Sequence, residues 1–385
     1  MATELIPIRR VVTGNDERGK SKVVWDGPAP NAQPASMGSR GHTDLWVWYE
    51  TPAPLSGDRD DGNLPYDFSG PAEGGHLRVV QGGAHPANYD PAKDTEIVPE
   101  HEPRARPSRR TWDRGGNNAY SSAMHKTETV DYGIMLSGER ELILDDRMLL
   151  MQPGDIVIQV GAWHQWSIPG PGGQMVFDMI AAGFVDGPVG LAQGSDVVVR
   201  ADGLKLPAGV KPARRIVTID KEPYRSTLVS DGPAPDVRTD PARPGFASAR
   251  LWVTDSMPAK IVPETLHLPH TIEPPARGSV CRVVTFPPDE SWKGRVGAAE
   301  VQAFFNAMGS PGASTYSPAA PHPYMQMTRT LDFCIVLEGE IVLVLDTQEV
   351  ELKAGDIVVQ RGTNHTWSNR SNNPAILAIA THDGA

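Results

Sequence analysis

The chain has 385 residues, a formal net charge of −11, 38 glycines and 36 prolines. Its length predicts two or three domains, and the many Gly and Pro residues favour short strands and turns over long helices. The acidic balance argues against nucleic acid or an anionic membrane as partners, because both attract basic surfaces. No apolar run approaches the roughly 18 residues of a transmembrane helix.

The two cysteines and the N-terminus predict a cytoplasmic protein. Cys281 and Cys334 lie in the apolar runs VCRVV and FCIVL. They are therefore expected to be buried and unpaired, which suits a reducing compartment. The N-terminal segment MATELIPIRRVVTG has no apolar signal core.

A long internal repeat runs along the chain. The matched segments are RRVVT (9–13) with RRIVT (214–218), DGPAP (26–30) with DGPAP (231–235), LWV (45–47) with LWV (251–253), 129–146 with 330–347, and 154–166 with 355–367. Their order is the same, and their offset stays between 201 and 206 residues. The chain is therefore predicted to be a tandem duplication, with an N-terminal domain at 1–205 and a C-terminal domain at 206–385.

The matched segments have the pattern of short antiparallel strands. GIMLSGERELILDD (133–146) is two apolar runs around a Gly, and RMLLMQPGDIVIQV (147–160) repeats this pattern around Pro-Gly, so both predict hairpins. Segments 54–75 and 84–120 are predicted to be long loops, and 297–309 a short helix. We expect an all-β fold of two sandwich or jelly-roll barrels with long irregular loops.

Two motifs stand in the same order in both halves. The first half has His125, Thr127, Asp131 and Gly138, then Gly154, Gly161 and His164. The second half has Gln326, Thr328, Asp332 and Gly339, then Gly355, Gly362 and His365. The interval from His125 to His164 is 39 residues, and so is the interval from Gln326 to His365.

These motifs resemble those of the cupin superfamily, most clearly over 121–182 and 322–381. The resemblance implies two tandem cupin barrels, each a double-stranded β-helix, and a metal site in the first. Thr127 stands where the family usually has its second His, and Gln159 where it usually has Pro. These departures place the complete sites of oxalate decarboxylases and quercetin dioxygenases in doubt.

The candidate metal ligands are His125, His164 and Asp131. Alternate residues of a barrel strand face inward, so His125 and Thr127 are predicted to point the same way. Two imidazoles and one carboxylate would form the facial triad of Fe(II) oxygenases, with Mn, Zn, Ni or Cu as alternative metals. Asp131 and His164 could instead have a structural role, because the second half keeps both residue types without the first His.

The second half is predicted to be a degenerate barrel. Gln326, Asp332 and His365 are a poor ligand set, although a Gln side chain can bind a metal weakly. We expect this barrel to stabilise the first and to shape its mouth, with an altered second site as the alternative.

Other residues are weaker candidates. Thr127, Tyr132 and Trp166 could line a substrate pocket. The basic cluster Arg104, Arg106, Arg109 and Arg110 could attract an anionic substrate, or could be a solvated loop. His85 and His101 lie in the same long loop and are expected to be surface histidines.

Three functions follow from the resemblance and the candidate site. The first is a metal-dependent, dioxygenase-like oxidoreductase that acts on a small organic molecule, phenolic or diketone-type, in the N-terminal barrel. The second is an isomerase, lyase or decarboxylase that uses the same metal as a Lewis acid. The third is a non-catalytic protein that binds small ligands. Assembly into a homo-oligomer is possible in each case.

Overall fold

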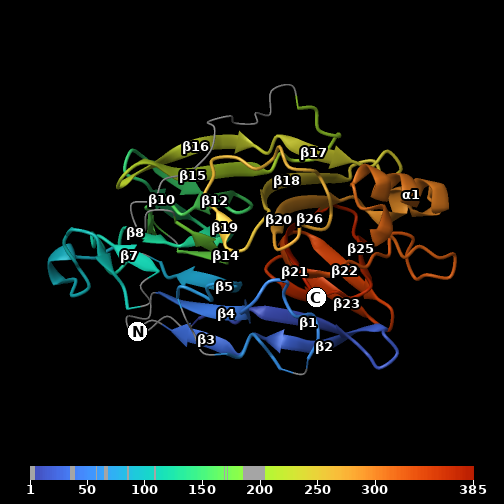
Figure 1. The fold of residues 1–385 in the computed structure, drawn as a ribbon, viewed down its shortest axis with the longest axis horizontal. Helices are drawn as coiled ribbons and strands as arrows, with labels where there is room; N and C mark the ends of the chain where they lie inside the picture. The colour runs from blue at the N-terminus through green and yellow to red at the C-terminus, as the bar shows by residue number, and fades with distance from the viewer. Residues whose placement is uncertain are drawn as a thin grey trace.

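The computed structural model describes residues 5–34, 40–57, 59–64, 68–84, 86–107, 110–168, 170, 172–184 and 204–385. Strands dominate these residues, so the predicted all-β fold is confirmed. Figure 1 shows two strand-rich bodies side by side, the green one built around the middle of the first half and the orange-red one around the second. We call them the first and second barrels.

Each barrel is built on one large sheet. In the described residues, the sheet of the first barrel has the order β16 (Arg225–Pro233), β15 (Arg214–Glu222), β12 (Ile156–Val160), β9 (Thr129–Gly138), β14 (Gly173–Gly183), β5 (Gly75–Gly82), β4 (Arg40–Trp48) and β3 (Asn31–Pro34), with β19 (Ala259–Lys260) beside β14. The sheet of the second barrel has the order β17 (Asp236–Thr239), β18 (Ala247–Thr254), β20 (Ser279–Phe286), β26 (Ala375–Asp383), β21 (Thr330–Glu338), β24 (Ile357–Arg361), β1 (Arg9–Asn15) and β2 (Ser21–Pro28).

The two halves of the chain exchange their first hairpins. The hairpin β1–β2 opens the first half, yet β1 pairs in parallel with β24 of the second barrel. The hairpin β15–β16 opens the second half and pairs with β12 of the first barrel in the same way. In Figure 1 the blue β1 and β2 accordingly lie beside the red strands. The predicted boundary near residue 205 follows the segment 185–203, which lies outside the described residues, and the division at that point stays a prediction.

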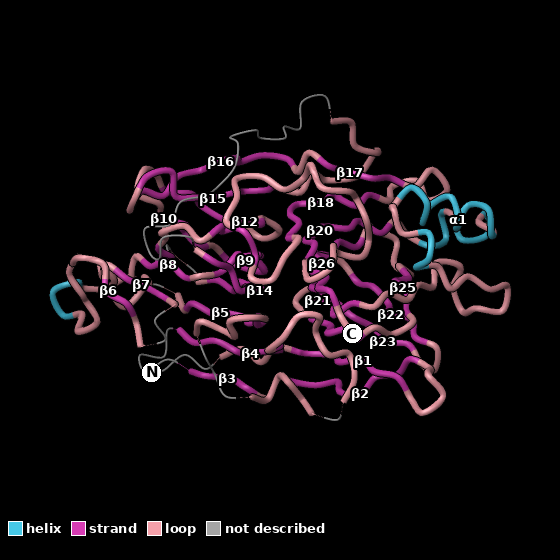
Figure 2. The backbone as a smooth tube through the Cα atoms, viewed as in Figure 1, coloured by secondary structure: helices cyan, strands magenta, loops and turns pink. Residues whose placement is uncertain are grey.

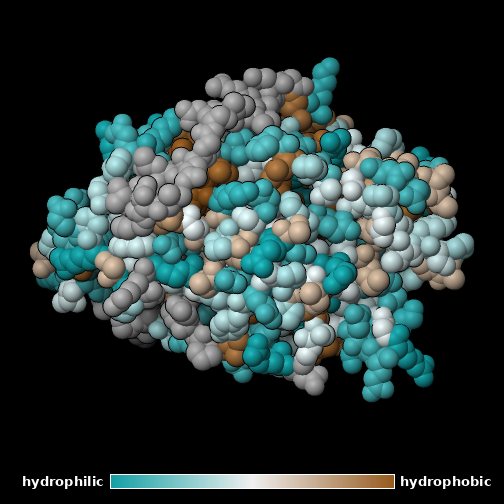
Figure 3. Space-filling view, viewed as in Figure 1, coloured by the Kyte–Doolittle hydropathy of each residue, from teal (hydrophilic) through white to brown (hydrophobic). Residues whose placement is uncertain are grey.

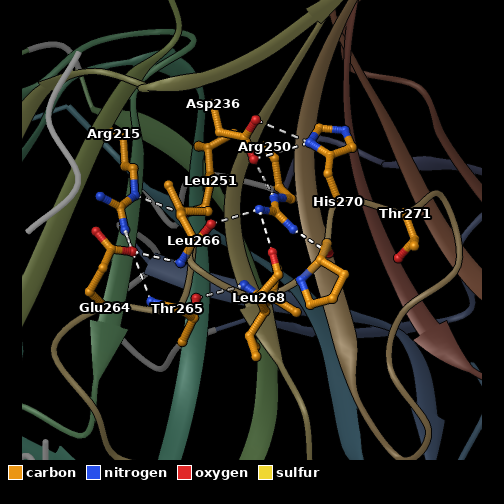
Figure 4. Close-up of polar contacts among 12 residues, drawn as sticks. Arg215, Asp236, Arg250, Leu251, Glu264, Thr265, Leu266, Leu268, His270 and Thr271 are labelled. Atoms are coloured by element: carbon orange, nitrogen blue, oxygen red, sulfur yellow. Dashed lines mark hydrogen bonds and ion pairs between the residues drawn. The ribbon is translucent and has the colours of Figure 1, made fainter. Parts of the chain in front are cut away.

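Repeated arginines connect each exchanged hairpin to the other large sheet. Arg10 of β1 donates to the carbonyl oxygen of Leu45 at 2.9 Å, and Arg215 of β15 donates to that of Leu251 at 2.7 Å. Arg215 also pairs with the buried Glu264 at 2.8 Å. Figure 4 shows this contact beside a second network in which Arg250 joins Asp236 and nearby carbonyl groups. The repeat of RRVVT and LWV in both halves, at separations that differ by one residue, thus reflects one contact made twice.

Three smaller sheets close the barrels. In the described residues they are β11 (Met148–Met151), β10 (Arg140–Ile143) and β13 (Gln165–Ser167); β23 (Glu349–Lys353), β22 (Glu340–Leu345) and β25 (His365–Ser368); and β6 (Arg104–Ala105), β7 (Thr111–Asp113) and β8 (His125–Thr127).

The predicted hairpins at 133–146 and 147–160 are wrong. β9 pairs with β12 and β14, whereas β10 pairs with β11 and β13, so the chain passes from the large sheet to a small one. Gly138 makes this corner with a φ of 68°, and a Cβ there would lie 2.0 Å from the carbonyl oxygen of Gly172. A Gly between two apolar runs therefore marks a change of sheet here, because only Gly fits this backbone and this close approach.

The interior is apolar, and helix is scarce in the described residues. Figure 2 shows the helical segments of the chain mainly at one end of the second barrel. There α1 (Ala298–Ala307) confirms the helix predicted at 297–309. The single-turn 3₁₀ helices are η1 (Pro91–Lys93), η3 (Asp289–Ser291), η4 (Lys293–Arg295) and η5 (Pro311–Ala313). Cys281 and Cys334 are buried and unpaired, as predicted. No described helix has the length and apolar character that crossing a membrane requires. Hydrophilic residues cover much of the face seen in Figure 3, with apolar residues in small patches.

Candidate functional site

The structure brings His125 and His164 together. His125 begins β8 and His164 precedes β13, and their backbones exchange two hydrogen bonds with N···O distances of 2.8 and 2.9 Å. The centroids of their rings are 4.2 Å apart. Both side chains are buried. The common separation of 39 residues therefore reflects two histidines that face each other across neighbouring strands.

Backbone carbonyl groups determine which ring nitrogen of each histidine carries the proton. Nδ1 of His125 lies 2.7 Å from the carbonyl oxygen of Ala123, and Nδ1 of His164 lies 2.9 Å from that of Ala162. A carbonyl oxygen only accepts, so Nδ1 must carry the proton, and Nε2 of the neutral ring keeps its lone pair. Burial lowers the pKa of His164 to about 4 and that of His125 well below its usual value, so both rings are neutral at pH 7. Metal-binding histidines have this same arrangement.

Both histidines line a cavity of about 330 Å³ inside the first barrel. Apolar side chains supply much of its wall, among them Phe68, Trp166 and Phe177. A cavity of this size and character suits a small organic molecule.

Asp131 lines the same cavity, but it does not form a three-residue metal site with the two histidines. Among the described residues, no group of three or more His, Cys, Asp or Glu side chains is arranged to hold a metal ion. Burial raises the pKa of Asp131 to about 7, and its Oδ1 has no hydrogen-bond partner in the described part of the chain. The two Nε2 atoms are suitable metal ligands, whereas Asp131 as the third ligand stays a prediction.

The candidate pocket residues divide into two groups. Thr127 and Trp166 line the cavity, and their contact with a substrate stays a prediction. Tyr132 does not: it is fully buried in the core shared by the two barrels, and its hydroxyl group lies 2.7 Å from Oγ of Ser279. Because Asp131 faces the cavity and side chains alternate along a strand, Tyr132 must face the opposite side.

The predicted basic cluster does not act as one unit. Arg106 lines the cavity and pairs with Asp113 at 2.9 Å, whereas Arg110 pairs with Glu128 and Arg104 is exposed. Arg109 and His85 lie outside the described residues. Nε2 of His101 lies 3.3 Å from Asp113, and the ring is outside the cavity of the histidine pair.

Sequence reasoning missed Asp220, which comes from the exchanged strand β15. Its carboxylate accepts from Nζ of Lys126 at 2.6 Å and from the backbone N–H of Trp163 at 3.0 Å. Lys126 follows His125 in the chain, and Trp163 precedes His164. One buried side chain of the second half therefore holds both histidine-bearing segments of the first barrel.

The second barrel repeats the backbone of this site with different chemistry. Gln326 and His365 exchange the same two backbone hydrogen bonds, at 2.8 and 2.9 Å. Nδ1 of His365 again lies 2.9 Å from a carbonyl oxygen, that of Thr363, so its Nε2 is an acceptor. The amide nitrogen of Gln326 lies 3.4 Å from this Nε2. Gln326 thus directs a donor at the lone pair that a metal would need.

Side chains also fill most of the second barrel. Its cavity near Gln326 has about 50 Å³, and Arg243 lies within it among Phe246, Phe304 and Tyr324, with its guanidinium carbon 3.6–4.3 Å from the three ring centroids. That the second barrel is degenerate stays a prediction. Whether Gln326, Asp332 and His365 bind anything stays a prediction.

The fold and the site define a class: paired all-β barrels of one repeated sequence, the first with two histidines facing an internal cavity. Residues 311–381 match the cupin domain family. Residues 311–381 thus form a cupin domain, and the internal repeat makes the matching segments of the first half similar to it.

Short segments of the chain are similar to fungal proteins. It is 58% identical over 48 residues to the phomopsin biosynthesis cluster protein C′ of Diaporthe leptostromiformis, which is 12% of this chain and 25% of that protein. It is 44% identical over 46 residues to the cupin-domain-containing oxidoreductase virC of Hypocrea virens, which is 12% of this chain and 24% of that protein. The matched segments thus span about a quarter of each relative.

Among solved structures, the putative glyoxylate-induced protein of Pseudomonas aeruginosa is 12% identical, with a TM-score of 0.38 over 89% of this chain and 79% of that chain. Similarity at this level says nothing about activity.

Proposed function

We propose that the protein is a metal-dependent oxidoreductase that acts on a small organic molecule, phenolic or diketone-type, in the first barrel. The observation that carries the proposal is the pair of buried Nε2 atoms of His125 and His164, both unprotonated in the neutral rings and both facing the 330 Å³ cavity. The printed name of the Hypocrea virens relative, an oxidoreductase, supports the reaction class.

A divalent metal, with Fe(II) the preferred ion and Mn, Zn, Ni and Cu the alternatives, would be held by His125 and His164. When bound, it would polarise a substrate oxygen and allow oxygen to approach the substrate. The remaining positions would be completed by water or substrate. We also propose that the protein works in the cytoplasm, where its two buried thiols would stay reduced.

The residues of the chain have three tasks in this proposal. The carbonyl groups of Ala123 and Ala162 keep the proton on Nδ1 of each histidine, so that Nε2 stays available. Asp220 keeps the two histidine-bearing segments at their observed separation. Phe68, Trp166 and Phe177 exclude water and pack against the apolar part of a substrate.

Oxygen consumption tests the proposal. Purified, Fe(II)-loaded protein is mixed with a panel of phenols and 1,3-diketones in an oxygen electrode, with His164→Ala as the inactive control and His365→Ala as the matched control in the second barrel. We expect substrate-dependent oxygen uptake that His164→Ala abolishes and His365→Ala keeps. Turnover that continues unchanged without oxygen would instead show an isomerase, lyase or decarboxylase. Metal-free protein that binds these compounds without converting them would show a ligand-binding protein.

A further inference from the structure

Three side chains form a row across the sheet of the first barrel. Asp131 of β9 is paired directly with Gln159 of β12 on one side and with Met179 of β14 on the other. Directly opposite residues of antiparallel strands point to the same face, with Cβ atoms about 4.5–5.5 Å apart. All three side chains line the cavity of the histidine pair. Gln159 and Asp131 therefore present neighbouring polar groups to that cavity.

Three atoms of these polar groups are buried without described partners, although the Asp131 carboxyl group is hydrogen-bonded to the hydroxyl of Thr129. Gln159 is 1% exposed, and neither its Nε2 nor its Oε1 has a hydrogen-bond partner among the described residues. Asp131 is 4% exposed, and its Oδ1 also lacks a described partner. A buried polar group without a hydrogen bond is costly, so native proteins rarely keep one unless something else binds it.

The second barrel has the same row but satisfies more of it internally. Oε1 of Gln360, which matches Gln159, accepts from the hydroxyl groups of Thr13, at 2.6 Å, and of Thr363. Asp332, which matches Asp131, is hydrogen-bonded to the hydroxyl of Thr381. One atom of each, Nε2 of Gln360 and Oδ1 of Asp332, still lacks a described partner.

The first barrel replaces two of these three hydroxyl-bearing residues. Ala162 stands at the position of Thr363, and Met179 pairs with Asp131 where Thr381 pairs with Asp332. Thr218 stands at the position of Thr13, and its hydroxyl group has no described partner either. The first barrel therefore leaves without a partner Oε1 of Gln159, whose counterpart in Gln360 is bound, and its Asp131 lacks the contact that Thr381 makes with Asp332.

The charges around the row favour a neutral ligand group. The guanidinium groups of Arg78 and Arg106 already lie beside Asp44, at 3.1 Å, and Asp113, at 2.9 Å. The guanidinium carbon of Arg140, which also lines the cavity, lies 5.5 Å from the centroid of the Trp166 ring. An anionic ligand group placed at the row would meet the carboxyl group of Asp131. A carboxamide suits the row better, because it carries a donor and an acceptor side by side, as does the side chain of Gln159.

We propose that Gln159 and Asp131 form a subsite for the amide group of a small organic substrate. The Gln159 amide donates to the carbonyl oxygen of the ligand, and Oε1 of Gln159 or Oδ1 of Asp131 accepts from its N–H. This inference rests on the proposed function for the choice of cavity, but binding at the subsite does not require a metal. In this proposal Asp131 binds the substrate and is not the third metal ligand.

Three matched probes test the subsite: benzamide, N,N-dimethylbenzamide, which lacks the N–H donors, and benzoate, which is anionic. Their affinities for the full chain are measured by isothermal titration calorimetry, with and without added Fe(II). We expect benzamide to bind more tightly than both analogues. Gln159→Leu should weaken benzamide about tenfold, the effect of one lost hydrogen bond, and should weaken N,N-dimethylbenzamide as well, because this analogue keeps the carbonyl oxygen to which the Gln159 amide donates. Gln360→Leu is the matched control and should leave benzamide binding unchanged.

Several results would overturn the proposal. They are equal affinity for benzamide and its dimethyl analogue, no measurable benzamide binding, or an unchanged benzamide affinity in Gln159→Leu. An unchanged or higher melting temperature of Gln159→Leu confirms that the variant is folded, because the substitution removes a costly buried amide. Asp131→Asn should keep the metal content of the wild type, and loss of metal would return Asp131 to the metal site. If the protein binds no metal but still prefers benzamide, the subsite is supported and only the proposed metal-dependent function is refuted.

Discussion

The buried pair between Lys126 and Asp220 should be one of the strongest single contacts between the two halves of the chain. The two side chains are 0% and 2% exposed and their charged atoms lie 2.6 Å apart. Asp220→Ala removes the carboxylate that faces Lys126 and the acceptor of the Trp163 N–H. Removing one partner of a buried ion pair typically costs about 3–5 kcal/mol. We expect a loss of that order in the free energy of unfolding.

Urea unfolding followed by tryptophan fluorescence measures this loss. Glu338→Ala is the matched control, because Glu338 pairs with Lys211 at 2.7 Å on the surface, where both side chains are more than half exposed. Such an exposed pair contributes little. A double variant, Lys126→Met with Asp220→Asn, introduces the residue types found at the matching positions of the second barrel, Met327 and Asn15. It should regain much of the stability, because replacing both members of a buried pair is often neutral.

A loss in Asp220→Ala no larger than that in Glu338→Ala would refute this reasoning. It would mean that the Lys126–Asp220 pair contributes no more than a surface contact. The exchanged strand β15 would then not be what holds the histidine-bearing segments together.

Three further predictions concern other parts of the fold. Gly138→Ala should lower the free energy of unfolding by at least about 1–2 kcal/mol, the cost of a left-handed non-glycine residue, before the clash with the Gly172 carbonyl is added; an unchanged melting temperature would contradict the sheet corner. Arg215→Met should cost about 3–5 kcal/mol in urea unfolding, because it leaves the buried Glu264 without its guanidinium partner; a neutral result would show that this pair does not connect the sheets. Burial raises the pKa of Asp131 to about 7 in the native protein, so between about pH 4 and 7 the native state binds more protons than the unfolded chain and its stability falls as the pH rises. In metal-free protein, the free energy of unfolding of Asp131→Asn should therefore gain about 1.4 kcal/mol per pH unit on that of the wild type in this window. A difference that does not change with pH would contradict the raised pKa.

The duplication and the histidine pair could both be predicted from the sequence. The equal interval of 39 residues in both halves predicted that His125 and His164 meet, and the structure confirms this contact. The inward position of Thr127 followed from strand alternation and is also confirmed. The same alternation, applied one residue further, would have excluded Tyr132 from the cavity, because Asp131 faces it.

The exchange of hairpins could not be predicted, because a local pattern does not say which sheet a strand joins. RRVVT has the same apolar strand pattern whether β1 pairs within its own half or with β24. Asp220 was missed for the same reason, since its contact with Lys126 spans 94 residues. A hairpin was predicted at Gly138 because a hairpin turn and a corner between two sheets both place a Gly between apolar runs.

The sequence also did not predict which polar groups of the two rows have hydrogen-bond partners. Gln159 and Gln360 occupy matched positions, and they differ only in the hydroxyl groups that surround them. Those neighbours come from distant strands, as with Thr13 and Gln360, which are 347 residues apart. The replacement of Thr363 by Ala162 is visible in the sequence, but its effect on the neighbouring amide is seen only in the structure.

Metal stoichiometry tests the central claim most directly. Protein purified without chelators is analysed by plasma mass spectrometry as wild type, His125→Ala and His365→Ala. If His125 and His164 hold the metal, the wild type and His365→Ala each contain one divalent ion per chain, and His125→Ala contains none. Equal loss of metal from His125→Ala and His365→Ala, or a wild type that binds no metal when Fe(II), Mn(II) and Zn(II) are supplied, would contradict the account.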